Sequence, residues 1–372
     1  MNNLAFRASD GAMTPDPSAA AYAVDAFDTA EQLWRLKPVW EALYENDPEA
    51  DFFLSFKWLS GIFRANPGRW SLYAVRHAGR YVCLFPARRD QRKSASAGVI
   101  RMELRAAGRL TFSEYTGFIC DPAHAAPALA ALAQHLSRTD FSRLSLRYEP
   151  TGTRSALFAA AFPAKEFRIK WPGYRINGGQ VDCLICPRVV LPGDFETYLA
   201  TGLSHKSRKR YRRHERRYLA SGAAHITVAT PGSMARDLDI LFDLWAAMWR
   251  KVYSPRRIAQ SIDRHRRLFE QAHALNMLYL PILWRDGRPL GALAHLADRD
   301  SGHCVFKMAG RDQAVTEPPV GLLLHVHSIR WAIANGFRLY DFGHGNEAYK
   351  YRFGATDLPV SYLTITRRGG GR

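Results

Sequence analysis

The chain has 372 residues, of which 47% are hydrophobic, and its 52 Lys and Arg against 34 Asp and Glu give a formal net charge of +18. This length suits two domains better than one, and the hydrophobic fraction is that of a globular protein with a sizeable core. No apolar run approaches the ~18–20 residues that a membrane-spanning helix needs, and the first residues lack the apolar stretch of a signal peptide. We therefore expect a cytoplasmic protein, and association with the inner face of the membrane stays open.

The Cys and His residues indicate neither a disulfide framework nor a metal site. Cys183 and Cys186 have the spacing of metal ligands, but no second pair or nearby His completes a set of four. His325 and His327 are two positions apart on one predicted helix, so they face different ways and cannot form a metal pair. The cysteines are odd in number and scattered, at Cys83, Cys120, Cys183, Cys186 and Cys304. We predict no bound metal.

The N-terminal half opens with a segment of low complexity. Residues 1–22 are rich in Ala, Ser, Pro and Asp, and we expect a disordered leader there. Residues 70–85 predict a strand, a glycine turn and a second strand. A helix over 126–136 and a strand over 141–147 follow.

The C-terminal half begins with three predicted helices, at 203–221, 237–251 and roughly 260–275, and Gly222 ends the first of them. Asp286-Gly287 signals a hairpin over 278–296. The remaining elements are a strand at 303–309, a helix at 321–335, a strand at 337–342 and a short helical segment at 346–353. This order is typical of a mixed α+β sheet rather than a doubly wound one.

The two halves repeat one pattern. Superposing Gly79 on Gly287 aligns the apolar residues on both sides, and in each half a helix and a strand follow the hairpin. A repeat of this length indicates two copies of one domain. We place the copies at 23–190 and 191–366, with a flexible tail at 367–372.

Positive charge is concentrated in residues 201–270, which hold 16 Lys and Arg against 6 Asp and Glu. Within Lys206–Arg217, eight of twelve residues are basic and Glu215 is the only acid. Such a helix can be a solvated surface, or it can steer an anionic substrate, a nucleotide or an acidic membrane to a site. Nucleic-acid binding is a third interpretation, which the lack of an RNA-binding signature disfavours.

Three stretches together resemble a known family. They are the basic helix from Leu203 to Arg213, the segment Pro319–His325 and the segment Tyr340–Gly354. In this order and spacing they resemble the GNAT acyltransferase superfamily, and within it the cellulose-biosynthesis (CelD/BcsL) type of GNAT-like protein, a relative of the Fem-type aminoacyl transferases. The resemblance covers about residues 195–355. It implies an α+β fold of two tandem GNAT-like domains, each a mixed, mostly antiparallel sheet flanked by helices, with a degenerate N-terminal copy.

The resemblance implies that acyl-CoA, the donor, binds where two parallel strands splay apart, here 303–309 and 337–342. The helix that opens at Gly321 would direct free N–H groups and its dipole at the pyrophosphate. Glu317, in the turn before this helix, departs from the glycine-rich pattern of the family and would repel phosphate. The residues expected to bind the cofactor are Met308, Ala309, Gly310, Val320, Gly321 and Leu322.

The resemblance also implies an acid just after the second strand. Tyr349 holds that place, with Tyr351 as its backup, because a phenol with a pKa near ~10 can protonate a thiolate leaving group. His344 and Glu347 are the candidate bases, and Asp341 could orient either of them. Lys350 matches the Tyr-Lys pattern of the family and could bind a substrate carboxylate or phosphate, or simply pair with Asp341 or Glu347. The predicted substrate-binding residues are Lys350, Tyr351 and Arg208.

We therefore predict an N- or O-acyltransferase that moves an acyl group from acyl-CoA, or another small thioester carrier, to an amine or hydroxyl. The family implies an acceptor in a polysaccharide or cell-envelope pathway. One alternative is a non-catalytic GNAT-like scaffold whose basic helix binds an anionic partner, such as a membrane, a synthase complex or nucleic acid. The other is an aminoacyl-tRNA-dependent transferase, although residues 203–275 are too interrupted for the long helical arm of Fem-type enzymes.

Overall fold

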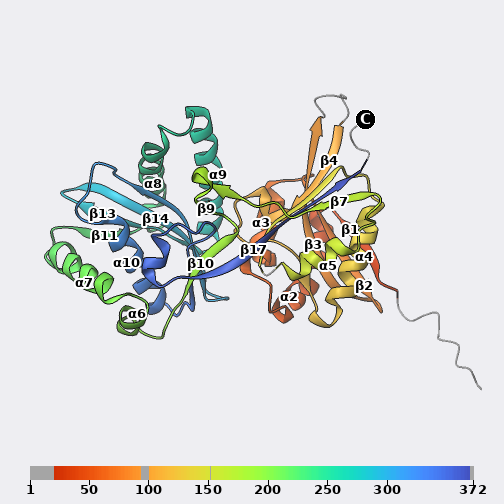
Figure 1. Cartoon of the computed structure of the whole chain (residues 1–372), viewed down its shortest axis with the longest axis horizontal. Coiled ribbons are helices and arrows are strands. Elements are labelled where there is room, and N and C mark those ends of the chain that lie inside the picture. The colour runs from red at the N-terminus through yellow and green to blue at the C-terminus, as the bar shows by residue number, and fades with distance from the viewer. Residues whose placement is uncertain (1–20, 94–99, 151, 369–372) are drawn as a thin grey trace, which may run out of the picture.

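The computed structural model describes residues 21–93, 100–150 and 152–368. Of the expected leader, residues 1–20 lie outside this range, as do residues 369–372 of the expected tail. The described chain forms two halves that lie side by side along the longest axis of the molecule (Figure 1).

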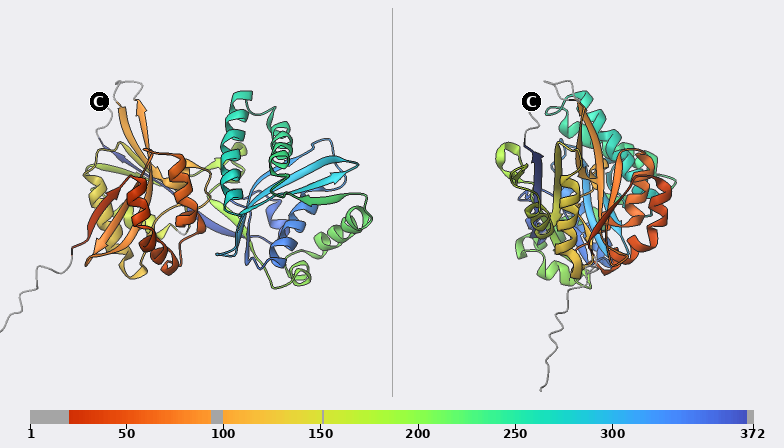
Figure 2. Two further views of the ribbon diagram at one scale, coloured as in Figure 1. Left: turned by 180° about the vertical axis from the view of Figure 1, so that it is seen from behind. Right: turned by 90° about the vertical axis from the view of Figure 1, so that its right-hand side faces the viewer.

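In the N-terminal half, a mixed sheet lies between α4 on one face and the helices α1 to α3 on the other (Figure 2). Its strands are β1 (Ala23–Phe27), β2 (Trp70–His77), β3 (Arg80–Lys93), β4 (Ile100–Ala106), β5 (Ile119–Cys120), β6 (Arg143–Pro150) and β7 (Phe167–Lys170). Its helices are α1 (Ala30–Arg35), α2 (Lys37–Asn46), α3 (Phe56–Ala65), α4 (Ala125–Ser137) and α5 (Thr153–Ala160).

In the C-terminal half, α8 and α10 cover opposite faces of the second part of the sheet. Its strands are β10 (Ile185–Val190), β11 (His225–Val228), β12 (Leu278–Tyr279), β13 (Pro281–Arg285), β14 (Arg288–Asp298), β15 (His303–Arg311), β16 (Leu339–Asp341) and β17 (Thr356–Arg367). Its helices are α6 (Phe195–Thr201), α7 (His205–His214), α8 (Met234–Trp249), α9 (Pro255–Ala274) and α10 (Val320–Ala334). The short strands β8 (Arg175–Ile176) and β9 (Val181–Asp182) pair with each other between the halves in sequence.

The repeat predicted from the sequence is confirmed by the pairing of the strands. In each half a hairpin is followed by a third antiparallel strand, a helix, and a strand parallel to the third, so that β4 pairs with β6 as β15 pairs with β16. Both hairpin turns have two positive φ angles, at Ala78 and Gly79 and again at Asp286 and Gly287, which matches the twist of the flanking strands. The protein therefore has the expected α+β fold, with two tandem copies of one mixed sheet.

One strand joins the two sheets. The start of β17, Thr356–Pro359, pairs with β10, and its remainder, Val360–Thr366, pairs with β6 of the N-terminal half. In the C-terminal sheet, β10 lies between β17 and β16, although it precedes residue 191. The boundary near residue 190 stays a proposal, because each sheet includes a strand from the other side of it. These strands are β17 in the N-terminal sheet and β10 in the C-terminal sheet.

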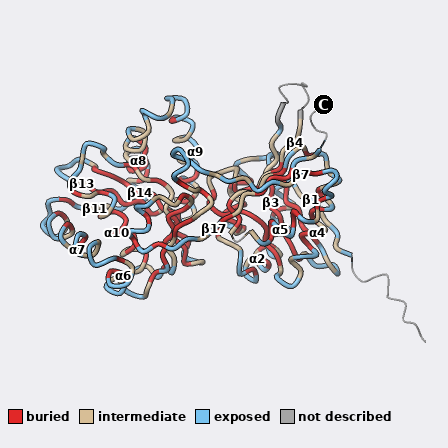
Figure 3. The backbone as a smooth tube through the Cα atoms, in the orientation of Figure 1, coloured by how far each residue is buried: buried red, intermediate tan, exposed pale blue. Residues whose placement is uncertain are grey.

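The two halves also share a hydrophobic core, in which Phe53 and Trp58 belong to the same buried cluster as Leu241 and Phe269. Figure 3 shows buried chain running through the middle of both sheets and across the region where they meet. Burial of large apolar side chains on both sides of this contact favours one fixed arrangement of the halves.

The basic helix α7 is one-sided. Ser204 caps it by accepting a hydrogen bond from the backbone N–H of Ser207, and Tyr211 and His214 are buried against the core. Beyond His214 the chain continues helically over Glu215–Ala220. Most of its basic side chains remain in solvent, and α7 lies at the far end of the C-terminal half (Figure 1).

Candidate active site

A cleft opens in the C-terminal sheet where β15 and β16 part. The two strands are parallel and pair from His303↔Leu339 to Val305↔Asp341. Beyond this point the chain stays on β10, since Phe342 donates to the carbonyl of Pro187, whereas β15 continues along β14 to Arg311. Gly343 and Gly345, at φ of 65° and 99°, then turn the chain away from β15. The splayed strands expected at 303–309 and 337–342 are thus present.

A cavity of about 750 Å³ lies at this splay, between the end of β15, the start of α10, the turn at 349–353 and α7. Its lining includes five of the six residues expected to bind a cofactor, namely Ala309, Gly310, Val320, Gly321 and Leu322. Met308 is the exception, because alternation along β15 turns its side chain into the core, where it is 4% exposed.

The mouth of this cavity favours anions. Arg210, Arg311 and Arg352 line it, and among the residues that the structure describes no carboxylate does. Pro319, the N-cap of α10, supplies no capping side chain, so the first N–H groups of the helix are left for a ligand. A Cβ at Gly321 would meet no atom within 4 Å, which leaves its backbone open.

Glu317, which is expected to repel phosphate, lies outside the lining of the cavity. Its carboxylate accepts a hydrogen bond from the Tyr218 hydroxyl at 3.1 Å and lies 3.5 Å from Nδ1 of His214. These partners hold it off the lining of the cavity. Its neighbours Thr316 and Pro318 line the cavity, whereas Glu317 itself does not.

Tyr349 lines the cavity, as the resemblance implies. Burial and the charge of Glu347 raise the pKa of its phenol, which keeps the proton on the oxygen across the physiological range. Tyr351, its predicted backup, lies elsewhere and donates a hydrogen bond to Oδ1 of Asp357 at 2.7 Å. Two residues apart in a tight turn, the two phenols point in different directions.

Arg208, predicted to bind the substrate, lies outside the cavity, and two of its neighbours line the cavity instead. Arg208 donates to the carbonyl of Ala200 and does not line the cavity, whereas Ser207 and Arg210 do. Each helical residue rotates the side-chain direction by about 100°, so a small error in the face of a helix selects the wrong residue. Charge pattern alone cannot set that rotation when nearly every position is basic.

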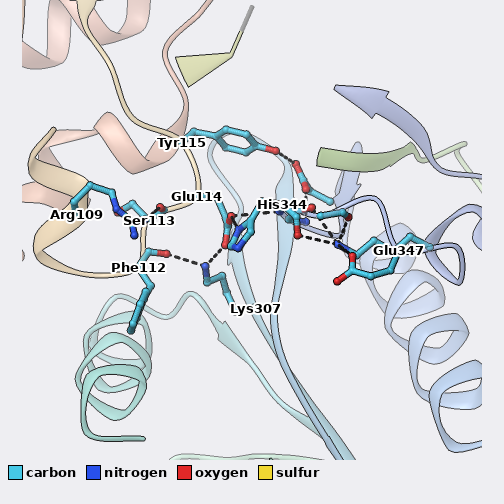
Figure 4. A network of polar contacts seen from close by, with 12 residues as sticks. Arg109, Phe112, Ser113, Glu114, Tyr115, Lys307, His344 and Glu347 are labelled. Carbon is cyan, nitrogen blue, oxygen red and sulfur yellow. Dashed lines mark hydrogen bonds and ion pairs between the residues drawn. The ribbon is translucent and has the colours of Figure 1, made fainter. Parts of the chain in front are cut away.

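His344 is not in the cavity. Figure 4 shows it beside Glu114 of the N-terminal half, and its Nδ1 lies 2.6 Å from Oε2 of that residue. Its ring stacks on Tyr148 with 4.9 Å between centroids. The structure therefore places this candidate base outside the lining of the cavity that Tyr349 borders.

Asp341 orients neither of the predicted bases. It is fully buried and accepts hydrogen bonds from the Tyr115 hydroxyl and from the backbone N–H of Gly343. Nε2 of His303 lies 3.2 Å from it, and Nδ1 of the same ring lies 2.9 Å from Asp51. Burial lowers the pKa of His303, but the charges and hydrogen bonds of Asp51 and Asp341 outweigh it and raise that pKa to about 10. Asp341 thus belongs to an ionic cluster between the halves.

Lys350 pairs within the protein instead of binding a substrate. Its ammonium donates to the carbonyls of Gly343, His344 and Gly345, and lies 3.0 Å from Oε2 of Glu347. At 2% exposure it has no free face. The pairing with Glu347 foreseen as an alternative is confirmed, and it leaves Glu347 as part of the support of the loop.

Three further residues escaped prediction. Glu114 and Lys307 form a buried ion pair beside His344, and His325 lines the cavity next to Tyr349. Burial alone would raise the pKa of Glu114, but Lys307 and His344 hold it well below its usual range. Glu114 and Lys307 are 193 residues apart in sequence, so no local pattern could pair them.

The described residues contain no group of three or more His, Cys, Asp or Glu side chains placed to hold a metal ion. Among the same residues, none of the helices combines the length and the apolar character that crossing a membrane requires.

Comparison with known proteins places this site in a familiar fold. A family model described as an acetyltransferase (GNAT) domain matches residues 205–351. No curated protein sequence matches the chain. The structure of FemX is similar with a TM-score of 0.62 at 10% identity, covering 91% of this chain and 96% of that one.

Two other solved structures are similar over most of their length. A tandem GNAT protein from the clavulanic acid biosynthesis pathway has a TM-score of 0.53 at 13% identity, covering 94% of this chain and 100% of that one. The C-terminal domain of a putative lysylphosphatidylglycerol synthetase from Agrobacterium fabrum has a TM-score of 0.52 at 12% identity, with 90% and 91% covered. Residues 205–351 thus match a GNAT acetyltransferase domain model, and the fold of the chain is similar to those of FemX and a tandem GNAT protein.

Proposed function

We propose that this protein is an N- or O-acyltransferase whose donor is acyl-CoA or another anionic thioester carrier. The observation that carries the proposal is the cavity at the β15/β16 splay, whose lining combines arginines, the uncapped N-terminus of α10 and the phenol of Tyr349. An anionic carrier bound at the mouth would extend its acyl end along the splay toward Tyr349.

The proposed reaction needs one bond made and one broken. The acceptor nitrogen or oxygen attacks the thioester carbonyl, the new C–N or C–O bond forms, and the C–S bond breaks. The departing thiolate takes the proton of the Tyr349 hydroxyl, which burial and Glu347 keep protonated until that moment. The proton lost by the acceptor returns the phenolate to a phenol.

Isothermal calorimetry with acetyl-CoA tests the donor. We expect binding to the unmodified protein and about a tenfold loss of affinity in Arg210→Ala, because a charge-assisted contact with phosphate is lost. Arg208→Ala is the matched control, since it removes the same charge from the same helix outside the cavity. Equal losses in the two variants would mean that the cavity does not hold the anionic end, and no binding at all would exclude CoA as the carrier.

The acceptor is proposed from the resemblance to the CelD/BcsL type, which implies a polysaccharide or cell-envelope pathway at the inner face of the membrane. The exposed basic side chains of α7, beside the cavity, would suit a nearby anionic surface. Flotation with vesicles containing anionic lipid, compared with neutral vesicles, tests this placement. If the protein floats with neither kind of vesicle, its proposed association with the membrane is wrong.

An aminoacyl-tRNA donor is the second candidate. The observation that favours it is the set of exposed basic side chains on α7 and the helical segment that follows it, near Ser207 and Arg210 of the cavity lining. These exposed residues are Lys206, Lys209, Arg213 and Arg216. Incubation with radiolabelled acetyl-CoA and with charged tRNA, each in the presence of amine acceptors, separates the two donors. Transfer from neither one, despite binding, would favour the non-catalytic scaffold.

A further inference from the structure

His325 belongs to a chain of hydrogen-bonded buried side chains and is the member that borders the cavity. Its Nδ1 lies 2.9 Å from the hydroxyl of Tyr340 on β16, and Nε2 of His295 on β14 lies 2.8 Å from the same hydroxyl. The other nitrogen of His295, Nδ1, faces the carbonyl of Tyr279 at 3.3 Å. All three side chains are buried, and only His325 borders the cavity.

The single proton of the Tyr340 hydroxyl fixes the tautomers of both rings. A carbonyl can only accept, so Nδ1 of His295 carries hydrogen and its Nε2 is an acceptor. Tyr340 donates its proton to that Nε2, which leaves the phenol oxygen to accept from Nδ1–H of His325. Nε2 of His325 is then a bare lone pair, for which the described residues supply no hydrogen-bond donor.

The surroundings keep His325 neutral. The rings of Phe306, Phe342 and Phe353 lie within 4.9–5.2 Å of its own, between centroids. This burial, with the nearby His295 and Lys350, holds the pKa of His325 well below its ordinary value. Beside the cavity there is therefore a neutral acceptor of fixed direction in an otherwise apolar wall.

His325 lies close to the start of α10, where the phosphates of a carrier are proposed to bind. It follows Gly321 by four residues on α10, so it lies on the same face of the helix and about 6 Å further inward. Tyr349 lines the cavity next to His325, with 5.9 Å between the ring centroids. A ligand whose phosphates meet the start of α10 would pass His325 before its thioester reaches Tyr349.

We propose that His325 is a specificity-determining residue whose Nε2 accepts a hydrogen bond from an N–H or O–H group in the arm of the thioester carrier. This inference rests on the proposed function. It selects carriers that bring a donor group about one helical turn inward from their phosphates, as the amides and hydroxyl of a pantetheine arm do. Tyr340 and His295 act as positioning residues, because they keep the proton off Nε2.

Nuclear magnetic resonance of the protein labelled with ¹⁵N-histidine tests the tautomer without any ligand. We expect Nδ1 of His325 to be protonated and Nε2 unprotonated at neutral pH, and Tyr340→Phe to convert this single form into a mixture. A protonated Nε2 in the unmodified protein would overturn the proposal. On addition of acetyl-CoA, the Nε2 resonance of His325 should shift, and that of His327 should not.

Calorimetry with acetyl-CoA tests the contact itself. We expect His325→Leu to weaken binding about tenfold and His325→Gln, whose amide oxygen can replace Nε2, to stay within about threefold. His327→Leu is the matched control, since it alters the same helix outside the lining of the cavity. Equal affinities in His325→Leu and His327→Leu would overturn the proposal.

The two proposals fail in different ways. If the unmodified protein does not bind acetyl-CoA, the CoA donor is wrong, and the same titration of ¹⁵N-histidine protein with charged tRNA then decides for His325. A shift of its Nε2 resonance would support a contact with a different carrier, and an unchanged resonance would overturn the proposed contact. If acetyl-CoA binds and the Nε2 resonance of His325 does not shift, the CoA donor is supported and the role proposed for His325 is wrong.

Discussion

The ammonium of Lys307 on β15 and the carboxylate of Glu114 form an ion pair in which each side chain is only 4% exposed. Glu114 comes from the N-terminal half, and its other oxygen lies 2.6 Å from Nδ1 of His344. Lys307 also donates to the carbonyl of Phe112. A loop of the N-terminal half thus contacts the C-terminal sheet through Lys307 and the turn after β16 through His344 (Figure 4).

Breaking this pair on one side should be costly. We expect Lys307→Met to lower the free energy of unfolding by about 3–5 kcal/mol, because it leaves the carboxylate buried without its main partner. Urea unfolding followed by tryptophan fluorescence measures the loss. Glu114→Leu combined with Lys307→Met should recover much of it.

The matched control is a surface pair of the same charge type, Arg267 and Asp263 on α9, whose side chains are 68% and 61% exposed. Arg267→Met should cost no more than about 0.5 kcal/mol. A loss of less than about 1 kcal/mol in Lys307→Met would show that the Lys307–Glu114 pair does not hold the halves together.

His303 should make stability depend on pH in the alkaline range. Its pKa is raised to about 10 in the folded protein, above the ordinary 6.5. The folded protein therefore binds this proton more tightly than the unfolded chain does. The contribution is complete below about pH 6.5 and is lost as pH rises toward 10, at up to about 1.4 kcal/mol per pH unit. Urea unfolding at several pH values between 6 and 9 should show this fall.

In His303→Gln the corresponding slope should flatten, although the protein is less stable at pH 6. The pH dependence rather than the absolute stability is the test, because any core substitution lowers the latter. Parallel slopes in the two proteins would contradict a charged His303 between Asp51 and Asp341.

The phenol of Tyr349 should matter for rate rather than for binding. We expect Tyr349→Phe to lower kcat by about 100-fold, because the thiolate loses its proton donor, and to change the affinity for acetyl-CoA by less than about threefold. Tyr351→Phe is the control, since its hydroxyl binds Asp357 outside the cavity. Release of free CoA, followed with a thiol reagent, gives both rates, and equal rates would remove Tyr349 from the mechanism.

Lys350 should stabilise the loop rather than bind substrate. Lys350→Met removes the donor to the three carbonyls of residues 343–345, and we expect a loss of about 3 kcal/mol in the free energy of unfolding. Exposed Lys206→Met should leave stability unchanged within about 0.5 kcal/mol. A Lys350→Met protein with normal stability but a raised KM would instead support the substrate contact predicted for Lys350.

The sequence by itself determined the local elements and their order. Asp286-Gly287 can adopt the two positive φ angles of a tight hairpin turn, and an apolar segment after Pro319 can only be a buried helix, so both follow from nearby residues. Comparison of the two halves of the sequence found the repeat, and the family resemblance pointed to the parts of β15 and α10 that border the cavity. The local elements depend on backbone preferences and on short-range periodicity.

Only the tertiary structure decided which side chains meet. Gly343 and Gly345 turn His344 toward Glu114, 230 residues earlier in the chain, and the rotation of α7 selects Arg210 over Arg208. His325 gained its fixed tautomer from Tyr340 and His295 on two different strands. Such contacts depend on packing between distant segments, where a few degrees of rotation change the partner, and no local pattern in the sequence records that rotation.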